Sequence, residues 1–394
     1  MAEVAVIGAG NVGLATAASL ANLGHWVCCA DAVADKVAAL SAGEVPIPEE
    51  GLAELVGDGL ASGRLRFVLG APAAVAGREI AFICVPTPQA GNGAADLSQV
   101  LGVAREIGPH LAPGAVVVTK STAPVGSTRL VGEALSRDDV GVVANPEFLR
   151  EGSAVRDCLH PERIVIGADD RAAAVRVAAL FEGIGAPVLI TDPPTAELTK
   201  YACNAFLATK ASFVNAIACL CEAVGADVAD VVVGMGYDHR IGFDYLRPGP
   251  GWGGSCLPKD TAALVRMGEE AGYDFDLLRG VIATNQAQRE AVVAKIRAMA
   301  GDSLQGRLVG VWGLAFKAGT DDLRDSPALA VIERLVRAGA RVRAYDPAVR
   351  GPFEGIEVCP DPYTAAQGAS VLAVLTEWEE LRALDFDKVA AVMA

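Results

Sequence analysis

The sequence predicts an α/β protein in which two α/β domains flank an all-helical centre. Short apolar runs alternate with helical segments over the first half of the chain. This rhythm stops after Asp192-Pro193-Pro194 and returns from Arg307. Alternating strands and helices indicate a mostly parallel sheet covered by helices on both faces. We therefore expect domains at residues 1–194, 195–303 and 304–394.

The first unit begins with a strand at Val4–Ile7, a helix that ends near Leu23, and a second strand at His25–Ala30 that leads into Asp31. Gly24 is a plausible helix stop between them. Four more apolar runs predict further buried strands. They are Ile80–Val85, Ala115–Thr119, Val140–Ala144 and Ile164–Ile166.

The middle region has no strand-like alternation. We expect one long helix over Ala196–Val224 and two more over Asp260–Ala271 and Val281–Ala300, interrupted by a glycine-rich loop at 248–254. In the last part the predicted elements are strands at Leu308–Trp312, Arg341–Tyr345 and Ser370–Leu375, with a helix at Ser326–Ala338.

Composition excludes several classes of protein. Of 394 residues, 52% are hydrophobic and 21% charged, which is unlike a disordered chain. The net charge of −15 argues against a partner such as nucleic acid or an anionic membrane surface. Anionic ligands would then have to depend on local positive charge. The nine cysteines include no CxxC pair, so neither a disulfide framework nor a metal site is expected.

One uncharged stretch, Val4–Ala30, is long enough to cross a bilayer. Four glycines and two asparagines interrupt it, and the chain opens with Met1-Ala2-Glu3, which lacks the basic start of a secretory signal. A second apolar stretch, Tyr201–Cys221, contains Asn204, Lys210 and Asn215. We expect a soluble, cytoplasmic protein.

A GxGxxG motif follows the first predicted strand and opens the first predicted helix. It comprises Gly8, Gly10 and Gly13, with Asn11 and Val12 between them. Such glycines allow a dinucleotide's pyrophosphate to approach a helix N-terminus. Asp31 lies where an acid binds the ribose hydroxyls of NAD and disfavours NADP, and Lys36 could add a contact. The alternative is a tightly packed βαβ unit without a cofactor.

Cys256 follows a glycine-rich loop and precedes a predicted helix. The helix dipole and Lys259 would both lower a thiol pKa, and Asp260 could share a helical face with the cysteine. A buried structural cysteine is the alternative.

Lys200 and Asn204, four residues apart on the long helix, could together stabilise an oxyanion. The alternative for this pair is a solvated lysine and a helix-packing amide.

Two further segments follow predicted strands, where ligand sites of parallel sheets lie. Glu147 and Glu151 are strand-end carboxylates suited to general-base chemistry, or else solvent-facing loop acids. Lys317 could bind phosphate, and Arg324 follows it.

Taken together, these motifs resemble the UDP-glucose/GDP-mannose dehydrogenase family over nearly the whole chain. The matching segments are GAGNVG, KSTAPVGS, NPEFLREGSA, ELTKYACNAFLA, GPGWGGSCLPKD and GLAFKAGTDDLRDSP. The resemblance implies an N-terminal NAD-binding Rossmann domain, a helical dimer-forming centre and a Rossmann-like C-terminal domain that binds the nucleotide sugar. A terminal strand with a DGRN-like motif, usual in the family, has no counterpart before Ala394, so the last domain is expected to be shortened.

The resemblance also implies a four-electron oxidation of a nucleotide-hexose C6 alcohol with two NAD⁺. Cys256 would form the thiohemiacetal and the thioester, and Lys200 and Asn204 would stabilise the oxyanion. Asp260 would position water or serve as a base. Glu147 would be the base for thioester hydrolysis, and Thr122 would orient a catalytic water. The implied cofactor contacts, beyond the first βαβ unit, are Thr87, Thr122, Glu151, Lys259 and Arg324. The implied substrate contacts are Glu147, Phe148, Leu149, Arg150, Glu151, Lys200, Asn204, Tyr245, Leu246, Arg247, Pro248, Gly249, Gly253 and Lys317, with Arg240 supplied by a partner subunit of a homodimer or larger homo-oligomer.

The resemblance implies UDP-glucose as the substrate, because the GPGxGGSC loop and the REGSA segment have the form seen in the glucose branch of the family. One alternative is dTDP-glucose, since uracil and thymine differ by one methyl group, worth about 1 kcal/mol of burial. The other alternative is GDP-mannose. Two rival classes remain open. One is a two-electron β-hydroxyacid dehydrogenase, which shares the Lys-x-x-x-Asn helix. The other is a non-catalytic NAD-binding regulator.

Overall fold

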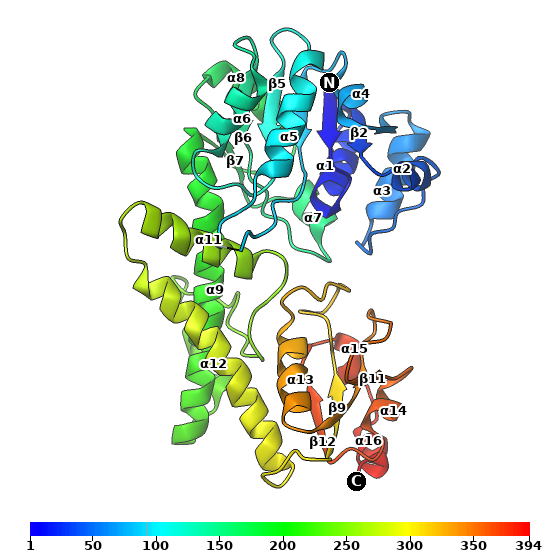
Figure 1. Ribbon diagram of the computed structural model, residues 1–394, viewed down its shortest axis with the longest axis vertical. Coiled ribbons are helices and arrows are strands. Elements are labelled where there is room, and N and C mark those ends of the chain that lie inside the picture. Colours follow the sequence, from blue (N-terminus) through cyan, green and yellow to red (C-terminus); the bar gives the residue numbers. More distant parts are fainter. Residues whose placement is uncertain (92) are drawn as a thin grey trace. The chain divides into compact units, whose positions relative to one another are not determined.

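The computed structural model describes residues 1–91 and 93–394 (Figure 1). The chain forms two compact units, Met1–Ala202 and Cys203–Ala394, each with its own core. The division falls within the long helix α9 (Pro193–Val224).

The N-terminal unit is built on a sheet that has eight strands among the described residues, in the order β3-β2-β1-β4-β5-β6-β7-β8. Neighbouring strands are parallel, except that β6 and β7 meet in an antiparallel pairing at Ala144 and Gly167. The strands are β1 (Glu3–Ile7), β2 (Trp26–Asp31), β3 (Leu65–Leu69), β4 (Ile80–Ile83), β5 (Val116–Thr119), β6 (Gly141–Ala144), β7 (Ile164–Gly167) and β8 (Val188–Thr191). The order 3-2-1-4-5-6 is that of a dinucleotide-binding Rossmann sheet.

Helices cover both faces of this sheet. They are α1 (Asn11–Asn22), α2 (Ala34–Ser41), α3 (Leu52–Ala61), α4 (Ala71–Val75), α5 (Ser98–Ile107), α6 (Ser127–Leu135), α7 (Ala154–Leu159) and α8 (Arg171–Ala178). Every strand predicted from the sequence is present, and the two that were not predicted, β3 and β8, are the edge strands of the sheet.

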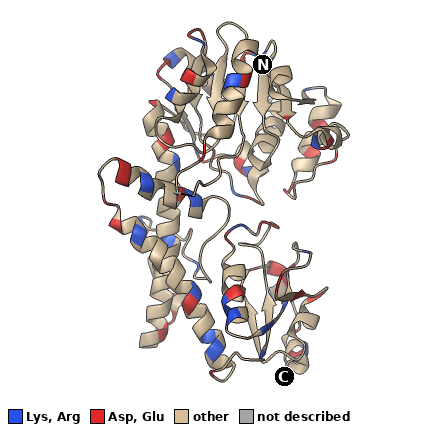
Figure 2. Cartoon of the chain, in the orientation of Figure 1, with Lys and Arg blue, Asp and Glu red and all other residues tan. Residues whose placement is uncertain are grey.

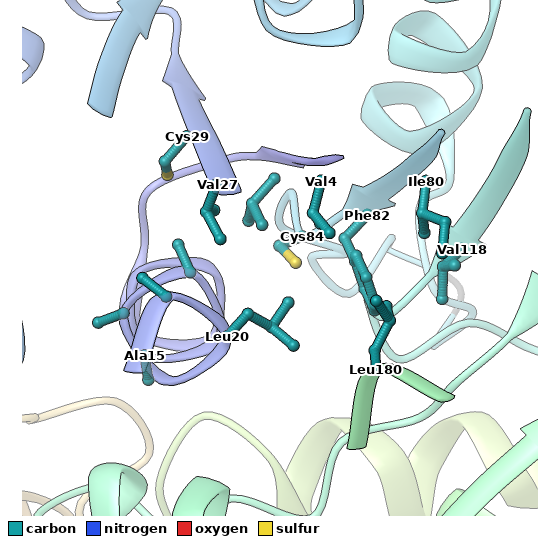
Figure 3. Packing of buried hydrophobic residues seen from close by; sticks show 14 of the residues in the cluster. Val4, Ala15, Leu20, Val27, Cys29, Ile80, Phe82, Cys84, Val118 and Leu180 are labelled. Carbon is teal, nitrogen blue, oxygen red and sulfur yellow. The ribbon is translucent and has the colours of Figure 1, made fainter. Parts of the chain in front are cut away.

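The core explains the uncharged N-terminal stretch. Along β1, Val4 and Val6 pack into the cluster on one face of the sheet, while Ala5 and Ile7 pack into the cluster on the other. Figure 3 shows the first cluster, in which Phe82 of β4 lies between Cys84 and Val118, with Leu180 at the end of its ring. A strand buried on both faces reads as a continuous apolar run. Val4–Ala30 is therefore the centre of a packed βαβ unit.

The second unit begins with the remainder of α9 and continues with α10 (Val228–Gly236), α11 (Leu257–Glu270) and α12 (Asp276–Met299). The predicted helices are confirmed, but α11 and α12 each start several residues earlier than predicted. Pro258 stands in the first turn of α11, where a proline fits because its missing N–H has no helical partner. Helix α10 was not predicted.

A second parallel sheet follows, with four strands among the described residues in the order β11-β10-β9-β12. Its strands are β9 (Leu308–Trp312), β10 (Arg341–Tyr345), β11 (Ile356–Val358) and β12 (Val371–Val374), and its helices are α13 (Pro327–Arg337), α14 (Pro362–Ala366), α15 (Glu379–Arg382) and α16 (Phe386–Val392). The C-terminal end of α12 joins this core through Val293 and Ile296, which pack in one cluster with residues of β9 and α13.

Among the described residues, α9 is the one helix long and apolar enough to cross a membrane by length and composition, with a third of its most apolar stretch buried. Such a helix also occurs in soluble proteins, so this is weak evidence of a span. All nine cysteines are free thiols.

Candidate active site

The glycine-rich turn between β1 and α1 has the geometry of a dinucleotide cradle. Gly8 adopts φ +98°, and a Cβ there would lie 2.8 Å from the Cys84 carbonyl oxygen. A Cβ on Gly13 would lie 1.7 Å from the Gly8 carbonyl oxygen. At Gly10, by contrast, a Cβ would meet nothing within 4 Å. Gly8 and Gly13 serve close packing, while Gly10 leaves open space at the α1 N-terminus for a phosphate group.

Asp31 at the end of β2 is tied to this turn. Its Oδ2 accepts hydrogen bonds from the Ala9 backbone N–H and from Lys36 Nζ, both at 3.0 Å. Its Oδ1 accepts one from the Val33 N–H at 3.1 Å. Burial raises the pKa of the Asp31 carboxyl, but the Lys36 and backbone hydrogen bonds outweigh it and leave the pKa below its ordinary value. The predicted cofactor acid thus supports the glycine turn, with Lys36 as its ion-pair partner.

The loops after β4 and β5 are joined at the carboxyl end of the sheet. Thr87 Oγ1 donates to the Thr122 carbonyl oxygen at 2.8 Å. Ser121 Oγ donates to the Val85 carbonyl oxygen at 2.6 Å. The two predicted threonines therefore belong to one connected edge of the sheet, where ligands of parallel sheets bind.

Glu147 and Lys200 form a buried ion pair, with Glu147 Oε1 2.9 Å from Lys200 Nζ and the two side chains 6% and 3% exposed. Glu147 Oε2 accepts a hydrogen bond from the Leu149 N–H at 2.6 Å. Burial pushes the pKa of Glu147 up, but the charge and hydrogen bond of Lys200, the Leu149 bond and the charge of Lys120 bring it below its ordinary value. Both solvent-exposed alternatives, a solvated Lys200 and a solvent-facing Glu147, are therefore wrong.

Cys256 is the N-cap residue of α11 and is partly exposed. The Asp260 N–H donates to the Cys256 carbonyl oxygen at 2.9 Å, which starts the helix. The Ser255 hydroxyl oxygen lies 3.5 Å from the Cys256 sulfur. The thiol therefore stands at the positive end of a helix dipole, as predicted, and is more accessible than buried cysteines such as Cys28 and Cys29.

Asp260 is fully buried one turn into α11. Its Oδ2 accepts from Asn204 Nδ2 and its Oδ1 from Lys259 Nζ, both at 2.6 Å. The carboxylate is thereby oriented by an amide from α9 and an ammonium from its own helix. Because Asn204 lies one turn beyond Lys200 on α9, this helix carries one partner of each buried carboxylate.

The glycine-rich loop before Cys256 is fixed by hydrogen bonds to α9 and α12. Asn285 accepts from the Trp252 N–H through Oδ1 and donates to the Trp252 carbonyl oxygen through Nδ2, each at 2.9 Å. Trp252 Nε1 donates to Ser212 Oγ at 2.8 Å, and the Gly249 N–H to Asn215 Oδ1 at 2.8 Å. The aromatic ring is therefore a buried anchor of the loop.

Two glycines of this loop touch the segment that precedes α13. A Cβ on Gly253 would lie 2.1 Å from the Asp325 carbonyl oxygen, and one on Gly254 would lie 2.6 Å from the Phe316 ring. The Gly254 N–H donates to the Arg324 carbonyl oxygen at 2.9 Å. The loop is thus held close to two predicted ligand residues, Arg324 and Lys317, whose Nζ lies 5.9 Å from the Phe316 ring centre.

Three predicted ligand arginines form ion pairs within the chain. Arg150 pairs with Asp157, Arg240 with Asp238, and Arg324 with Asp322. Each guanidinium is more than half exposed, so each could exchange its carboxylate for a ligand. Two predicted substrate residues contrast in exposure: Leu246 is buried, and Tyr245, at φ +61°, is exposed. Arg247 and Pro248 are exposed as well.

Comparison with known proteins agrees with this geometry. Three models of the UDP-glucose/GDP-mannose dehydrogenase family match in sequence: the NAD binding domain at residues 2–185, the central domain at 194–287 and the UDP binding domain at 310–394. The chain belongs to the UDP-glucose/GDP-mannose dehydrogenase family. Residues 2–185 therefore form an NAD-binding domain, and the protein is an NAD-dependent oxidoreductase with a nucleotide-sugar substrate.

Individual relatives are similar over most of their length. The chain is 46% identical to the UDP-glucose 6-dehydrogenase of Rhizobium meliloti (strain 1021), covering 99% of this chain and 93% of the relative. It is 44% identical to UDP-glucose 6-dehydrogenase TuaD of Bacillus subtilis (strain 168), covering 100% and 87%. A solved UDP-glucose dehydrogenase from the archaeon Pyrobaculum islandicum superposes with a TM-score of 0.93 at 40% identity, covering 98% and 92%.

Several residues at the site were not predicted from the sequence. Lys120 is buried after β5 and donates to Asn145 Oδ1 at 3.1 Å. Glu197 is buried on α9 and accepts three hydrogen bonds from the N-terminus of α6. Its position three residues before Lys200, on the same helical face, was the one available signal. Among the described residues there is no cluster of three or more side chains able to hold a metal ion.

Proposed function

We propose that the enzyme oxidises the C6 alcohol of UDP-glucose to the carboxylate of UDP-glucuronate, with reduction of two NAD⁺ per sugar. The similar proteins named UDP-glucose 6-dehydrogenase support the substrate. The observation that carries the reaction is the partly exposed Cys256 at the N-terminus of α11, with Asp260 buried and oriented beside it. A two-electron dehydrogenase needs no such thiol.

The balance is one alcohol, two NAD⁺ and one water giving one carboxylate, two NADH and three protons. NAD⁺, when bound, accepts a hydride in each of the two oxidations. The Cys256 thiolate adds to the C6 aldehyde to form a thiohemiacetal, whose oxidation gives a thioester on the same sulfur. Covalent capture divides a difficult oxidation and keeps the aldehyde from escaping.

The ion pairs of the site suit the remaining proposed roles. Lys200 and Asn204 are proposed to stabilise the oxyanion at C6. Glu147, which the lowered pKa keeps ionised, is proposed to accept a proton from the water that hydrolyses the thioester. Asp260 and Thr122 are proposed to orient water. The arrangement supplies an ionised base and a cation in one buried pair.

The nucleotide sugar is proposed to contact the Glu147–Glu151 segment, the Tyr245–Gly249 segment, Gly253 and Lys317. The fixed loop around Trp252 supports this assignment because it holds Gly253 against the segment that contains Arg324. Thr87, Glu151, Lys259 and Arg324 are proposed as further NAD contacts. Lys259 is bound to Asp260 at 2.6 Å, which makes it a link between that carboxylate and the cofactor.

The test is a product balance with a panel of UDP-glucose, dTDP-glucose and GDP-mannose. The expected result is two NADH per uronate, with the highest kcat/KM for UDP-glucose. One NADH per product, with aldehyde released, would favour a two-electron dehydrogenase. A higher kcat/KM for dTDP-glucose or GDP-mannose would show that this nucleotide sugar is the substrate, and the proposed four-electron oxidation would still hold.

The Cys256→Ser variant tests the covalent step. We expect acid formation to fall by at least about 10³-fold, because an alcohol is a far weaker nucleophile than a thiolate. Cys203→Ser, which changes a partly exposed thiol of α9, is the control and should retain its activity. Unimpaired acid formation by Cys256→Ser would remove the cysteine from its role.

We further propose that the enzyme is a cytoplasmic homodimer whose subunits meet through α9. Phe206, Phe213 and Leu220 recur every seven residues and are 65%, 52% and 56% exposed. Between Phe206 and Leu220 the helix sequence contains a single charged residue, Lys210. In Figure 2 most of α9 is tan, the colour of residues other than Lys, Arg, Asp and Glu. Large exposed apolar side chains on one helical face are typical of a subunit interface. Arg240 is proposed to act in the partner's site.

A further inference from the structure

The Ser121–Gly126 loop, which carries Thr122, is held by an acid from a distant element. Glu197 of α9 is 5% exposed. Its Oε2 accepts from the Gly126 N–H at 2.6 Å, and its Oε1 accepts from both the Thr128 N–H and Thr128 Oγ1 at 2.7 Å. Three short hydrogen bonds therefore join one buried carboxylate to the start of α6.

These bonds perform the work of a helix cap. The N-cap residue of α6 is Gly126, at φ +93°, which has no side chain to cap the first turn. The first N–H groups of a helix have no partner inside it, and a carboxylate at this end also interacts favourably with the helix dipole. Glu197 supplies both the acceptor and the negative charge.

The same carboxylate borders the site. Glu197 lies one helical turn before Lys200, and these two side chains line a small cavity of about 10 Å³ together with Ser121 and Thr122. The other end of the loop is fixed separately, where Ser121 Oγ donates to the Val85 carbonyl oxygen at 2.6 Å. The loop is thus anchored on both sides of Thr122, and one anchor shares a helix with the proposed oxyanion lysine.

We propose that Glu197 is a positioning residue: by capping α6 it sets the Ser121–Gly126 loop and holds Thr122 in place against Lys200. The inference rests on the proposed function, because Thr122 acts on the water there. It assigns Glu197 no contact with the reacting atoms. Burial raises the pKa of the Glu197 carboxyl, and its hydrogen bonds to Thr128 and Gly126 oppose that effect.

The first experiment compares Glu197→Gln with Asp170→Asn by steady-state kinetics with UDP-glucose and NAD⁺. Glutamine has nearly the same size as glutamate, but its NH₂ group would face one of the backbone N–H groups that now donate to the carboxylate, so that hydrogen bond is lost. We expect kcat to fall about 10- to 100-fold with KM for the sugar within about threefold, since small misplacements of catalytic groups have effects of this size. Asp170 caps α8 in the same way, through the Ala172 N–H at 2.8 Å, and its variant should keep its kcat.

The second experiment separates positioning from general stability. In a Thr122→Val background, Glu197→Gln should lower kcat by less than about threefold, because residues that act through each other are not additive. An equally large loss in both backgrounds would overturn the inference. If Glu197→Gln does not fold, Thr128→Val removes one donor to the carboxylate, and the same comparison applies with an expected loss of about 3- to 10-fold.

A third measurement does not depend on turnover. Hydrogen exchange of the backbone amides of residues 121–128 should be faster in Glu197→Gln than in wild type and unchanged in Asp170→Asn. Unchanged exchange in Glu197→Gln would overturn the inference even if the wild-type enzyme oxidised none of the nucleotide sugars. That latter result would instead count against the proposed function.

Discussion

At the scale of single residues, an aspartate at a strand end supports the first loop of each α/β domain. Asp31 accepts a hydrogen bond from the Ala9 N–H, in the turn after β1. In the C-terminal domain, Asp346 follows β10 and accepts from the N–H groups of Leu314 and Ala315, at 2.7 and 3.0 Å, in the loop after β9. The same interaction thus shapes two loops whose sequences do not match.

We predict that Asp31→Asn weakens NAD⁺ binding through this loop. The amide cannot accept from Ala9 and Lys36 at one atom and from Val33 at the other, because its nitrogen only donates. Loss of a buried acceptor costs about 1–3 kcal/mol. KM for NAD⁺ should rise roughly tenfold or more, with a smaller loss for NADP⁺ because the repulsion of a 2′-phosphate also falls. Steady-state kinetics with both cofactors measures this. An unchanged KM ratio would contradict the prediction.

The buried environment of His25 predicts that the N-terminal domain is sensitive to acid. The Ala2 N–H donates to His25 Nδ1 at 3.1 Å, so Nε2 carries the proton and donates to the Leu180 carbonyl oxygen at 2.9 Å. Burial lowers the pKa of His25 below 6.5, aided by the N-terminal charge and opposed by the Leu180 bond. Below pH 6.5 the unfolded chain therefore takes up the proton more readily than the folded one.

We predict that stability falls as the pH is lowered from 7 towards 5, and that His25→Asn makes this fall shallower. Asparagine can still accept from Ala2 but does not titrate. Urea unfolding at several pH values provides the measurement. His160→Asn, at a histidine that is exposed, is the control. Parallel pH profiles for wild type and His25→Asn would show that His25 does not carry the effect.

Some site residues could be predicted from the sequence because their signals are local. The glycine turn, Cys256 with Asp260, and the Lys200/Asn204 pair all lie within short motifs. Glu197 and Asn285 could not be predicted, because their partners lie 71 and 33 residues away. Such contacts arise from the tertiary fold. For Glu197 the sequence offers only its spacing of three residues from Lys200, which does not reveal the contact with α6.

At the scale of elements, predictability followed burial. Of the predicted strands, β4 and β5 are buried along their whole length and β1 is buried from Val4 to Ile7. The two missed strands of the first sheet, β3 and β8, are its edges, and their residues are partly exposed. Edge strands face solvent, and Arg66 interrupts the apolar residues of β3. β8, by contrast, contains the apolar run Val188–Ile190, so its sequence did carry a strand signal that was missed. In the second sheet, the edge strand β11 was missed because it has three residues with Glu357 at its centre, whereas β12, the other edge, was predicted from its apolar run Val371–Val374.

We predict that the glycine-rich loop before α11 depends on Asn285 for its position. Asn285→Ala leaves the Trp252 N–H without its acceptor and leaves the Trp252 carbonyl oxygen with Arg289 Nη2 alone, at 3.3 Å. An unsatisfied buried group costs about 1–3 kcal/mol. We expect lower stability to urea and a lower kcat, since the loop leads to Cys256. Thr284→Ala, on an exposed face of α12, is the matched control. Wild-type kcat together with lowered stability would show that the loop does not depend on this anchor for catalysis.

For the whole molecule, the net charge of −15 means that the cations of the proposed site lie within an acidic surface. Ion pairs place the cations of the proposed site beside acids, as in Lys200 with Glu147 and Lys259 with Asp260. An anionic nucleotide sugar would therefore be bound by local cations and helix N-termini within an acidic surface. Arg240 is such a cation, 79% exposed beside Asp238.

The proposed dimer predicts that Phe213→Glu, in the middle of the exposed α9 face, produces monomers. Burying a glutamate in a symmetric apolar contact is unfavourable twice, once for each subunit. Analytical ultracentrifugation should show dissociation at micromolar protein, whereas Val233→Glu, an exposed position of α10, tests whether the interface extends beyond α9. A dimeric Phe213→Glu protein would place the interface elsewhere.

If Arg240 acts in the partner's site, activity can be restored by mixing two inactive proteins. Arg240→Ala and Cys256→Ser homodimers should each be nearly inactive. After subunit exchange, half of the dimers are mixed, and each mixed dimer holds one site with both an intact Cys256 and the partner's Arg240, so activity should reach about a quarter of wild type. If Arg240 instead acts within its own subunit, no mixed dimer gains a complete site and the mixture stays inactive. Pre-steady-state NADH bursts, which count intact sites, should give the same quarter.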